Sequence, residues 1–237
     1  MKNFQGSYNL THQVTNDLGL AIVQGKYQPD QSFPTEAQLA EKYEISRSVM
    51  REAVKMLTAK GLISSRPRQG IRLQPNTQWN MFDSDVLGWT LNSRPSLNLL
   101  HEFTQLRFGI EPEAAALAAK CNDNNAMEVI EKALHRMYLA ELGQDDTLEA
   151  DIAFHTSILL ASNNRFFIQL RRFIETALRV SITYTNRLAQ VKFASYEEHK
   201  KVFEPIKAGN ADEAVQAMRA LLQEALDLID GALAKNN

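Results

Sequence analysis

Hydrophobic residues in the first quarter of the chain recur at the spacing of helices. Residues 11–24 form the first predicted helix, which ends at Gly25 and carries Val14, Leu18, Ala21 and Ile22 on one face. Thr35 can cap a short second helix after a Pro-rich stretch. The third predicted helix opens at Ser46 and ends at Gly61, with its apolar positions at Val49, Ala53, Met56 and Leu57. The tight turn between the last two helices predicts a helix-turn-helix.

The periodicity changes after Gly61. Residues 62–65 and 71–73 are short β-like runs, and the turn between them is rich in Arg and Gly: Arg66-Pro67-Arg68-Gln69-Gly70. We interpret them as a two-stranded wing. The first unit is therefore predicted to be a winged helix-turn-helix of three helices and one hairpin.

Beyond the wing, the pattern is helical throughout. Seven helices are predicted, at 83–92, 96–119, 124–142, 147–162, 164–189, 195–208 and 211–234. Pro112 is expected to kink or split the second of them. The predicted organisation is a DNA-binding domain at 1–75, a linker at 76–82 and an all-α bundle of six to seven helices at 83–237, which makes the fold mainly α.

The chain has 237 residues, of which 44% are hydrophobic and 23% are charged. This composition is typical of ordinary globular proteins. No apolar run is long enough for a membrane span, the N-terminus has no signal-peptide core, and one cysteine permits no internal disulfide. We expect a cytoplasmic protein without a membrane partner.

The charge is divided unevenly, although the net charge is only −2. Residues 1–75 contain ten Lys and Arg and six Asp and Glu, which is a basic excess. Residues 76–237 contain 16 Lys and Arg and 22 Asp and Glu, which is an acidic excess. The basic excess is concentrated between residues 42 and 72. Such a segment favours an anionic polymer as the partner of the first domain.

The start of the third helix combines features that suit duplex DNA. Ser46, Arg47, Ser48 and Arg51 are its exposed positions, and a helix N-terminus offers free N–H groups to phosphate while Arg can reach guanine edges. The wing adds four residues: Arg66, Arg68, Gln69 and Gly70. Charged runs are often only solvated faces. Here the basic residues of the third helix and those of the wing belong to one winged helix-turn-helix, so we predict binding to double-stranded DNA.

A second constellation lies on the helix at 147–162. Asp151 and His155 share a face with apolar residues that should point inward. Buried polar groups need a partner, and this pair is either a structural hydrogen bond or half of a divalent metal site. His199, on another predicted helix, is the next candidate ligand.

The chain resembles the GntR superfamily of bacterial transcription factors. The resemblance rests on Phe33-Pro-Thr-Glu-Ala-Gln-Leu-Ala40, Ile45-Ser-Arg-Ser-Val-Met-Arg-Glu-Ala-Val54 and the Arg-rich wing. It implies that operator contacts come from Ser46, Arg47, Ser48, Val49 and Arg51, with wing residues around Arg68, Gln69 and Gly70. Family members often have Arg at the position of Ala37, so one contact is missing here.

Residues 83–234 are similar to the FCD effector domain of the FadR-type branch. The cues include Leu106-Arg-Phe-Gly-Ile-Glu111 and Asp151-Ile-Ala-Phe-His155. Many FCD domains hold a divalent metal with one Asp and three His, which implies Asp151, His155 and His199 as ligands. Leu221 occupies the usual fourth position and cannot ligate. The site is then either a zinc site of three ligands, completed by water or effector, or a pocket without metal.

The same resemblance implies an effector that carries a carboxylate. Arg107 matches the FCD residue that holds this group, although an Arg on a helix more often faces solvent or pairs with a residue such as Glu111. Asp151, Thr185 and Asn186 complete the predicted effector residues. The tract at 78–89 is similar to FCD regulators of sugar-acid catabolism.

The leading hypothesis is therefore a homodimeric repressor that is not an enzyme and whose DNA binding responds to a small carboxylate, a sugar acid. Two alternatives remain. A zinc-dependent hydrolase would use Glu198 as its base, but no nucleophile or oxyanion motif accompanies it. An architectural DNA binder without effector would leave the polar face at 147–162 unexplained.

Overall fold

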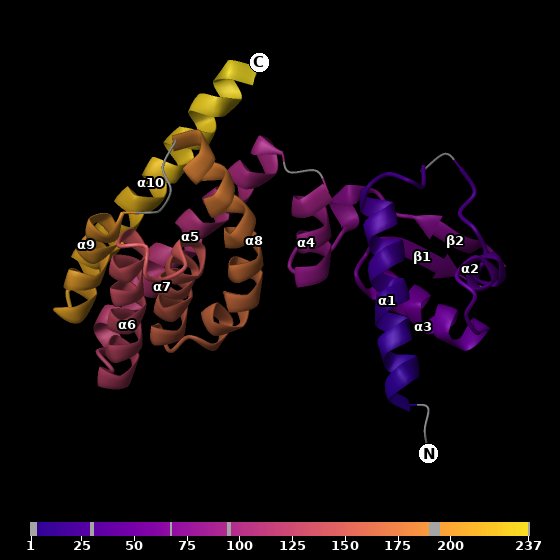
Figure 1. The fold of residues 1–237 in the computed structure, drawn as a ribbon, viewed down its shortest axis with the longest axis horizontal. Helices are drawn as coiled ribbons and strands as arrows, with labels where there is room; N and C mark the ends of the chain where they lie inside the picture. Colours follow the sequence, from indigo (N-terminus) through magenta and orange to yellow (C-terminus); the bar gives the residue numbers. More distant parts are fainter. Residues whose placement is uncertain (1–3, 29–30, 67, 94–95, 190–194, 237) are drawn as a thin grey trace. The chain divides into compact units, whose positions relative to one another are not determined.

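The computed structural model describes residues 4–28, 31–66, 68–93, 96–189 and 195–236. Its internal contacts divide the chain into two compact units, Met1–Arg94 and Pro95–Asn237 (Figure 1). The first unit contains helices and a two-stranded sheet, and the second is helical wherever regular structure is described. This confirms the predicted fold class, a winged helix-turn-helix followed by a helical bundle.

The first unit is built on three helices, α1 (Phe4–Val23), α2 (Glu36–Lys42) and α3 (Arg47–Ala59). The helix α1 starts at Phe4, earlier than the hydrophobic pattern predicted, because Gly6, Ser7 and Asn9 interrupt the apolar spacing before position 11. The Thr35 hydroxyl accepts a hydrogen bond from the Gln38 N–H, and the Gln38 side chain accepts one from the Thr35 N–H. This reciprocal cap fixes the start of α2.

The wing is the antiparallel pair β1 (Ile63–Arg66) and β2 (Gly70–Leu73), in which Ile63 pairs with Leu73 and Arg66 with Gly70. Its inner face joins the core of the unit. The fully buried side chains of that core include Leu18, Leu39, Met50, Leu57 and Leu62. Leu18 and Leu57 are among the apolar positions that gave the helical spacing, whereas Met50 was not one of them.

The segment after the wing packs back onto the first unit. It contains a short 3₁₀ turn, η1 (Asn76–Gln78), and the helix α4 (Ser84–Ser93). Trp89 lies against α1, where its Nε1 donates a 2.7 Å hydrogen bond to Asn16. Lys60, near the end of α3, forms ion pairs with Asp83 and Asp85 at 2.7 and 2.8 Å. The helix α4, which the pattern grouped with the second domain, thus has its contacts with the first.

The second unit consists of α5 (Leu97–Cys121), α6 (Asn124–Glu141), α7 (Thr147–Ala161), α8 (Arg165–Ala189), α9 (Tyr196–Lys207) and α10 (Ala211–Asn236). The helix α10 packs along α5, and α7 packs between α6 and α8 (Figure 1). Phe154 and Ile158 of α7 are fully buried. The central helix α7 is therefore covered on several sides, which explains why its sequence is apolar nearly all round.

Pro112 lies inside α5, which continues through it as one helix. The predicted split is therefore absent; Pro112 is itself buried among the alanines of this helix, where packing compensates for the lost backbone hydrogen bond. Among the described helices, none has both the length and the apolar composition needed to cross a bilayer.

Candidate functional site

The exposed start of α3 is organised by its cap. The Ser46 Oγ atom accepts a hydrogen bond from the Val49 N–H at 3.3 Å and lies 2.9 Å from Ser48 Oγ. The cap fixes the direction of the first turn, so that Arg47 and Ser48 are exposed beside it. One end of the helix thus presents hydroxyls, a guanidinium group and unpaired N–H groups to solvent.

The remaining predicted residues of this helix differ in exposure. The Arg51 side chain is 65% exposed and lies 3.6 Å from Glu36 of α2, a loose surface pair. Val49 is only 8% exposed. It therefore offers little surface to a DNA groove, and its packing anchors the helix instead.

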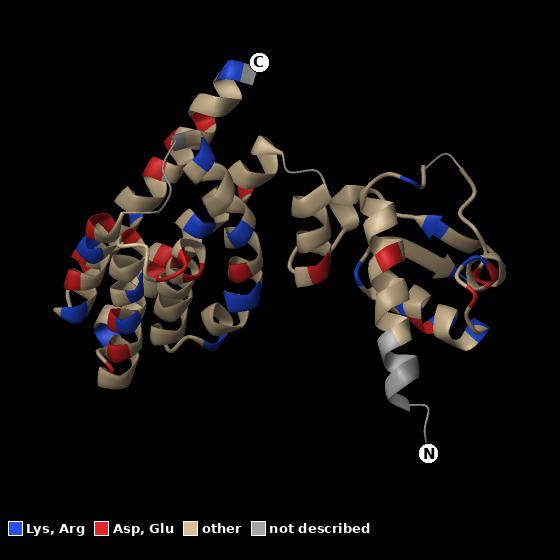
Figure 2. Ribbon diagram, in the orientation of Figure 1, with Lys and Arg blue, Asp and Glu red and all other residues tan. Residues whose placement is uncertain are grey.

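The wing presents a second set of exposed residues, which are Arg66, Arg68, Gln69 and Gly70. The Gln69 N–H donates to the Arg66 carbonyl at 3.1 Å, and both Arg68 and Gly70 have positive φ angles of 64° and 74°. Pro67 of this turn lies outside the described residues. Figure 2 marks Lys and Arg on α3 and β2, and Arg47, Arg51 and Arg72 of these elements are exposed.

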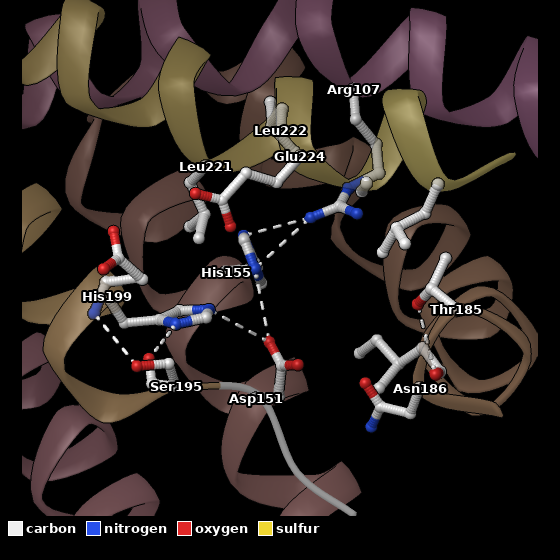
Figure 3. Close-up of a pocket in the computed structure, with 14 residues that line it drawn as sticks. Arg107, Asp151, His155, Thr185, Asn186, Ser195, His199, Leu221, Leu222 and Glu224 are labelled. Atoms are coloured by element: carbon white, nitrogen blue, oxygen red, sulfur yellow. Dashed lines mark hydrogen bonds and ion pairs between the residues drawn. The ribbon is translucent and has the colours of Figure 1, made fainter. Parts of the chain in front are cut away.

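A cavity of about 290 Å³ lies within the second unit (Figure 3). All the effector and metal residues predicted from the sequence line it: Arg107, Asp151, His155, Thr185, Asn186 and His199. They come from α5, α7, α8 and α9, so residues far apart in the chain meet in one place. Leu221 of α10 lines the same cavity, as its position in the resemblance implied.

Three of these side chains form a buried cluster that could hold a metal ion, namely Asp151, His155 and His199. The Asp151 Oδ1 atom lies 3.2 Å from His155 Nε2 and 3.4 Å from His199 Nε2. In a tetrahedral zinc site with bonds of about 2.0–2.1 Å, ligand atoms lie about 3.3 Å apart. The spacing of these donors therefore matches two edges of such a site.

The hydrogen bonds of the two imidazoles point their Nε2 atoms toward Asp151. His199 Nδ1 lies 2.8 Å from the Ser195 carbonyl, an acceptor only, so Nδ1 carries the proton. His155 Nδ1 lies 2.7 Å from the Glu111 carboxylate in the same way. Within the described part of the chain, the buried atoms Asp151 Oδ1 and His199 Nε2 have no hydrogen-bond partner. Electron-rich atoms that converge in this way need a cation or a proton between them.

Arg107 and Glu111 complete the polar cluster from α5. Arg107 Nε donates to Glu111 Oε1 at 2.6 Å, and Arg107 Nη2 lies 3.3 Å from both ring nitrogens of His155. An atom equally close to both nitrogens must lie over the ring, because in its plane it would collide with the carbon between them. The guanidinium group therefore leaves the in-plane lone pair of His155 Nε2 free.

The electrostatics keep both carboxyl groups of the cluster ionised. Burial alone would raise the pKa of Glu111, but Arg107 and His155 lower this pKa to about 2. Burial alone would also raise the pKa of Asp151, but the adjacent imidazoles of His155 and His199 hold this pKa well below the usual range. The pKa of His155 is raised, since the carboxylates outweigh the opposing effects of burial and of Arg107.

Some lining residues gave no signal in the sequence. Ser195 contributes a backbone carbonyl, which has no motif, and Glu224 lies on the exposed side of α10, where a carboxylate is unremarkable. On α8 the structure brings the predicted Thr185 and Asn186 to the cavity, while the nearby Thr183 is exposed. The Thr185 hydroxyl donates to the backbone of its own helix and keeps its lone pairs for a ligand.

Known proteins match both units. Residues 10–73 match the family described as bacterial regulatory proteins, gntR family, and residues 102–224 match the FCD domain. The galactonate operon transcriptional repressor of Escherichia coli (strain K12) is 32% identical over 215 residues, which cover 90% of this chain and 94% of that protein. The HTH-type transcriptional regulator YieP of the same organism, described as uncharacterized, is 30% identical over 222 residues, covering 91% and 93% of the two chains.

A solved structure extends the comparison to the fold. The structure of Lar, which controls expression of the Listeria monocytogenes agr system, aligns with a TM-score of 0.58 at 18% identity, over 92% of this chain and 95% of that one. The winged unit, the helical unit and the matched relatives all belong to transcriptional regulators rather than to enzymes, which leaves the hydrolase alternative without support. The chain is a member of the gntR family of DNA-binding bacterial regulators, in the FadR-type branch that carries an FCD domain.

Proposed function

We propose that this regulator is a homodimeric repressor that releases its operator when a small carboxylate, a sugar acid, enters the metal-containing cavity of its FCD domain. The observation that carries the proposal is the charge balance of the buried cluster around Asp151.

The metal site uses Asp151, His155 and His199 as ligands, with zinc as the ion that suits one carboxylate and two imidazoles. Leu221 leaves a coordination position without a protein ligand, so water or the effector completes the site. The Nδ1 protons held by Glu111 and by the Ser195 carbonyl are the second hydrogen bonds that metal-ligating histidines require.

The charge balance makes acid binding depend on this metal. A histidine that binds a metal must be a neutral imidazole. With both imidazoles in that form, Arg107 contributes one positive charge and Glu111 and Asp151 contribute two negative charges, so the ligand cluster without its ion is anionic. A carboxylate would then meet net repulsion in a buried site. A divalent cation changes the net charge of the cluster from negative to positive, and the incoming carboxylate neutralises the remaining positive charge.

The acid is held by Arg107 through its free guanidinium edge, because Glu111 occupies the Nε side. Thr185 and Asn186 supply hydrogen-bonding groups on the other wall, which suits a polyol chain. A volume of about 290 Å³ fits a small ligand. The relative that represses a galactonate operon supports a sugar acid as the effector class.

The DNA side uses Ser46, Arg47, Ser48 and Arg51 on α3, together with the wing residues Arg66, Arg68, Gln69 and Gly70. Two protomers would place two such surfaces on the half-sites of a near-palindromic operator. Since chromosomal DNA is the target, the site of action is the bacterial cytoplasm.

The proposal is tested with full-length protein and a duplex selected by that protein from a random-sequence library. Galactonate serves as the first acid probe, followed by other sugar acids. We expect an acid to release the duplex from zinc-loaded protein and to be recovered unchanged, while protein stripped by a chelator keeps the duplex bound. Acid-driven release that is undiminished after metal removal would contradict the charge argument.

A further inference from the structure

Glu111 is the one residue of the buried cluster that contacts both the acid-binding and the metal-binding side chains without lining the cavity. It is 1% exposed and lies one helical turn after Arg107 on α5. Its Oε1 atom accepts a hydrogen bond from Arg107 Nε at 2.6 Å, and its Oε2 atom accepts one from His155 Nδ1 at 2.7 Å. Each carboxylate oxygen thus serves a different subsite.

We infer that Glu111 is a positioning residue that fixes the tautomer of His155 for the metal and the orientation of Arg107 for the acid. This inference rests on the proposed metal and acid pocket. It assigns a role to a side chain that would contact neither the ion nor the effector.

The effect on His155 follows from the single N–H of a neutral imidazole. With the Nδ1 proton donated to Glu111, the lone pair is on Nε2, which lies 3.2 Å from Asp151 Oδ1. Without an acceptor at Nδ1, the Nε2–H tautomer would be available as a donor to Asp151. That tautomer cannot bind a metal through Nε2.

The effect on Arg107 follows from the shape of its guanidinium group. Glu111 takes the edge formed by Nε and Nη2, at 2.6 and 3.4 Å, so the edge formed by Nη1 and Nη2 remains for a carboxylate. Both side chains are nearly fully buried, so their mutual hydrogen bonds are strengthened by the low local dielectric. One carboxylate therefore couples the geometry of the two subsites.

Glu111→Gln separates this role from simple packing, because the amide has the same shape. Arg107 Nε is a donor only, so the amide oxygen must face Arg107 and the amide NH₂ must face His155 Nδ1. Nδ1 then has to accept, and the proton moves to Nε2. We expect the affinity for Zn²⁺, measured on full-length protein by competition with a chromophoric chelator, to fall about 10- to 100-fold.

A direct readout of the tautomer accompanies the affinity measurement. In metal-free protein labelled with ¹⁵N at histidine, the resonances missing from a His155→Gln variant identify His155. At a pH high enough to keep the ring neutral, they should report Nδ1–H in the wild type and Nε2–H in Glu111→Gln. The matched control is Glu113→Gln, an exposed glutamate on the same helix, which should change neither the affinity nor the tautomer.

Glu111→Asp keeps the charge and provides a second test if the amide variant folds poorly. The shorter side chain cannot span both partners, so either Zn²⁺ affinity or galactonate-driven DNA release should fall. Wild-type Zn²⁺ affinity in Glu111→Gln, or wild-type behaviour of Glu111→Asp in both assays, would overturn the inference. A wild-type protein that binds no Zn²⁺ would instead refute the proposed metal site, so the two failures are distinguishable.

Discussion

His199 donates a 2.8 Å hydrogen bond from Nδ1 to the backbone carbonyl of Ser195, one turn earlier in the chain. This contact turns the Nε2 atom of His199 toward Asp151, at 3.4 Å. Because the acceptor belongs to the backbone, no side-chain substitution at position 195 removes it. The orientation of His199 is therefore built into the start of α9, whereas that of His155 depends on the side chain of Glu111.

Leu221→His should strengthen metal binding. Leu221 lines the cavity that contains the three candidate ligands, so an imidazole there can supply a fourth donor. We expect the Zn²⁺ dissociation constant to fall at least about tenfold, or ~1.4 kcal/mol, in a chelator competition assay. Leu228→His, at another lining position, is the control. An unchanged constant in Leu221→His would show that this side chain is not directed at the metal.

Arg107→Ala should uncouple the two units functionally. The DNA-contacting residues belong to the first unit, so operator affinity should remain near the wild-type value, while the acid loses a charge-assisted contact of ~1.5–3 kcal/mol. Galactonate titrations in a gel-shift assay would report the loss of release. Arg107→Lys should restore little of the acid-driven release, since an ammonium group cannot reproduce the planar pair of N–H donors of a guanidinium group. Release at the wild-type galactonate concentration would mean that the acid is held elsewhere.

Arg47→Ala and Arg51→Ala should each weaken operator binding by ~1–3 kcal/mol if the residue contacts a base edge through two hydrogen bonds. Both side chains are exposed on the surface of α3. Glu36→Gln should have the opposite, smaller effect, because it frees Arg51 from its 3.6 Å pair and removes a negative charge near the phosphates. Fluorescence anisotropy at a fixed salt concentration checks all three. Arg165→Ala, on the second unit, should leave the affinity unchanged.

Gly19→Ala should destabilise the first unit. A Cβ atom at position 19 would lie 2.3 Å from the Trp89 ring, so α4 would have to move away from α1, at a cost of ~1–3 kcal/mol. Both tryptophans, Trp79 and Trp89, belong to this unit, and their fluorescence during urea unfolding reports on it selectively. The control is Gly109→Ala, where the added Cβ meets open space. A wild-type unfolding midpoint in Gly19→Ala would refute the close packing of Trp89.

Local patterns along the chain were enough to predict the elements of the fold and most of the candidate residues. Amphipathic spacing identified α3, because a helix that buries one stripe must repeat its apolar residues every three or four positions. The caps at Thr35 and Ser46 were equally local, since capping depends on side chains next to the first turn. Asp151 and His155 could be paired for the same reason, as neighbours on one helix.

How distant segments meet could not be predicted from local patterns, because it depends on the packing of whole helices. The approach of His199 to Asp151 and of Glu111 to His155 depends on the packing of α5, α7 and α9, and no local spacing encodes a distance between helices. The association of α4 with α1 likewise depends on Trp89 and Asn16, which are far apart in the chain. Pro112 is tolerated within α5 because surrounding helices bury it, an effect of packing that overrides the preference of the residue.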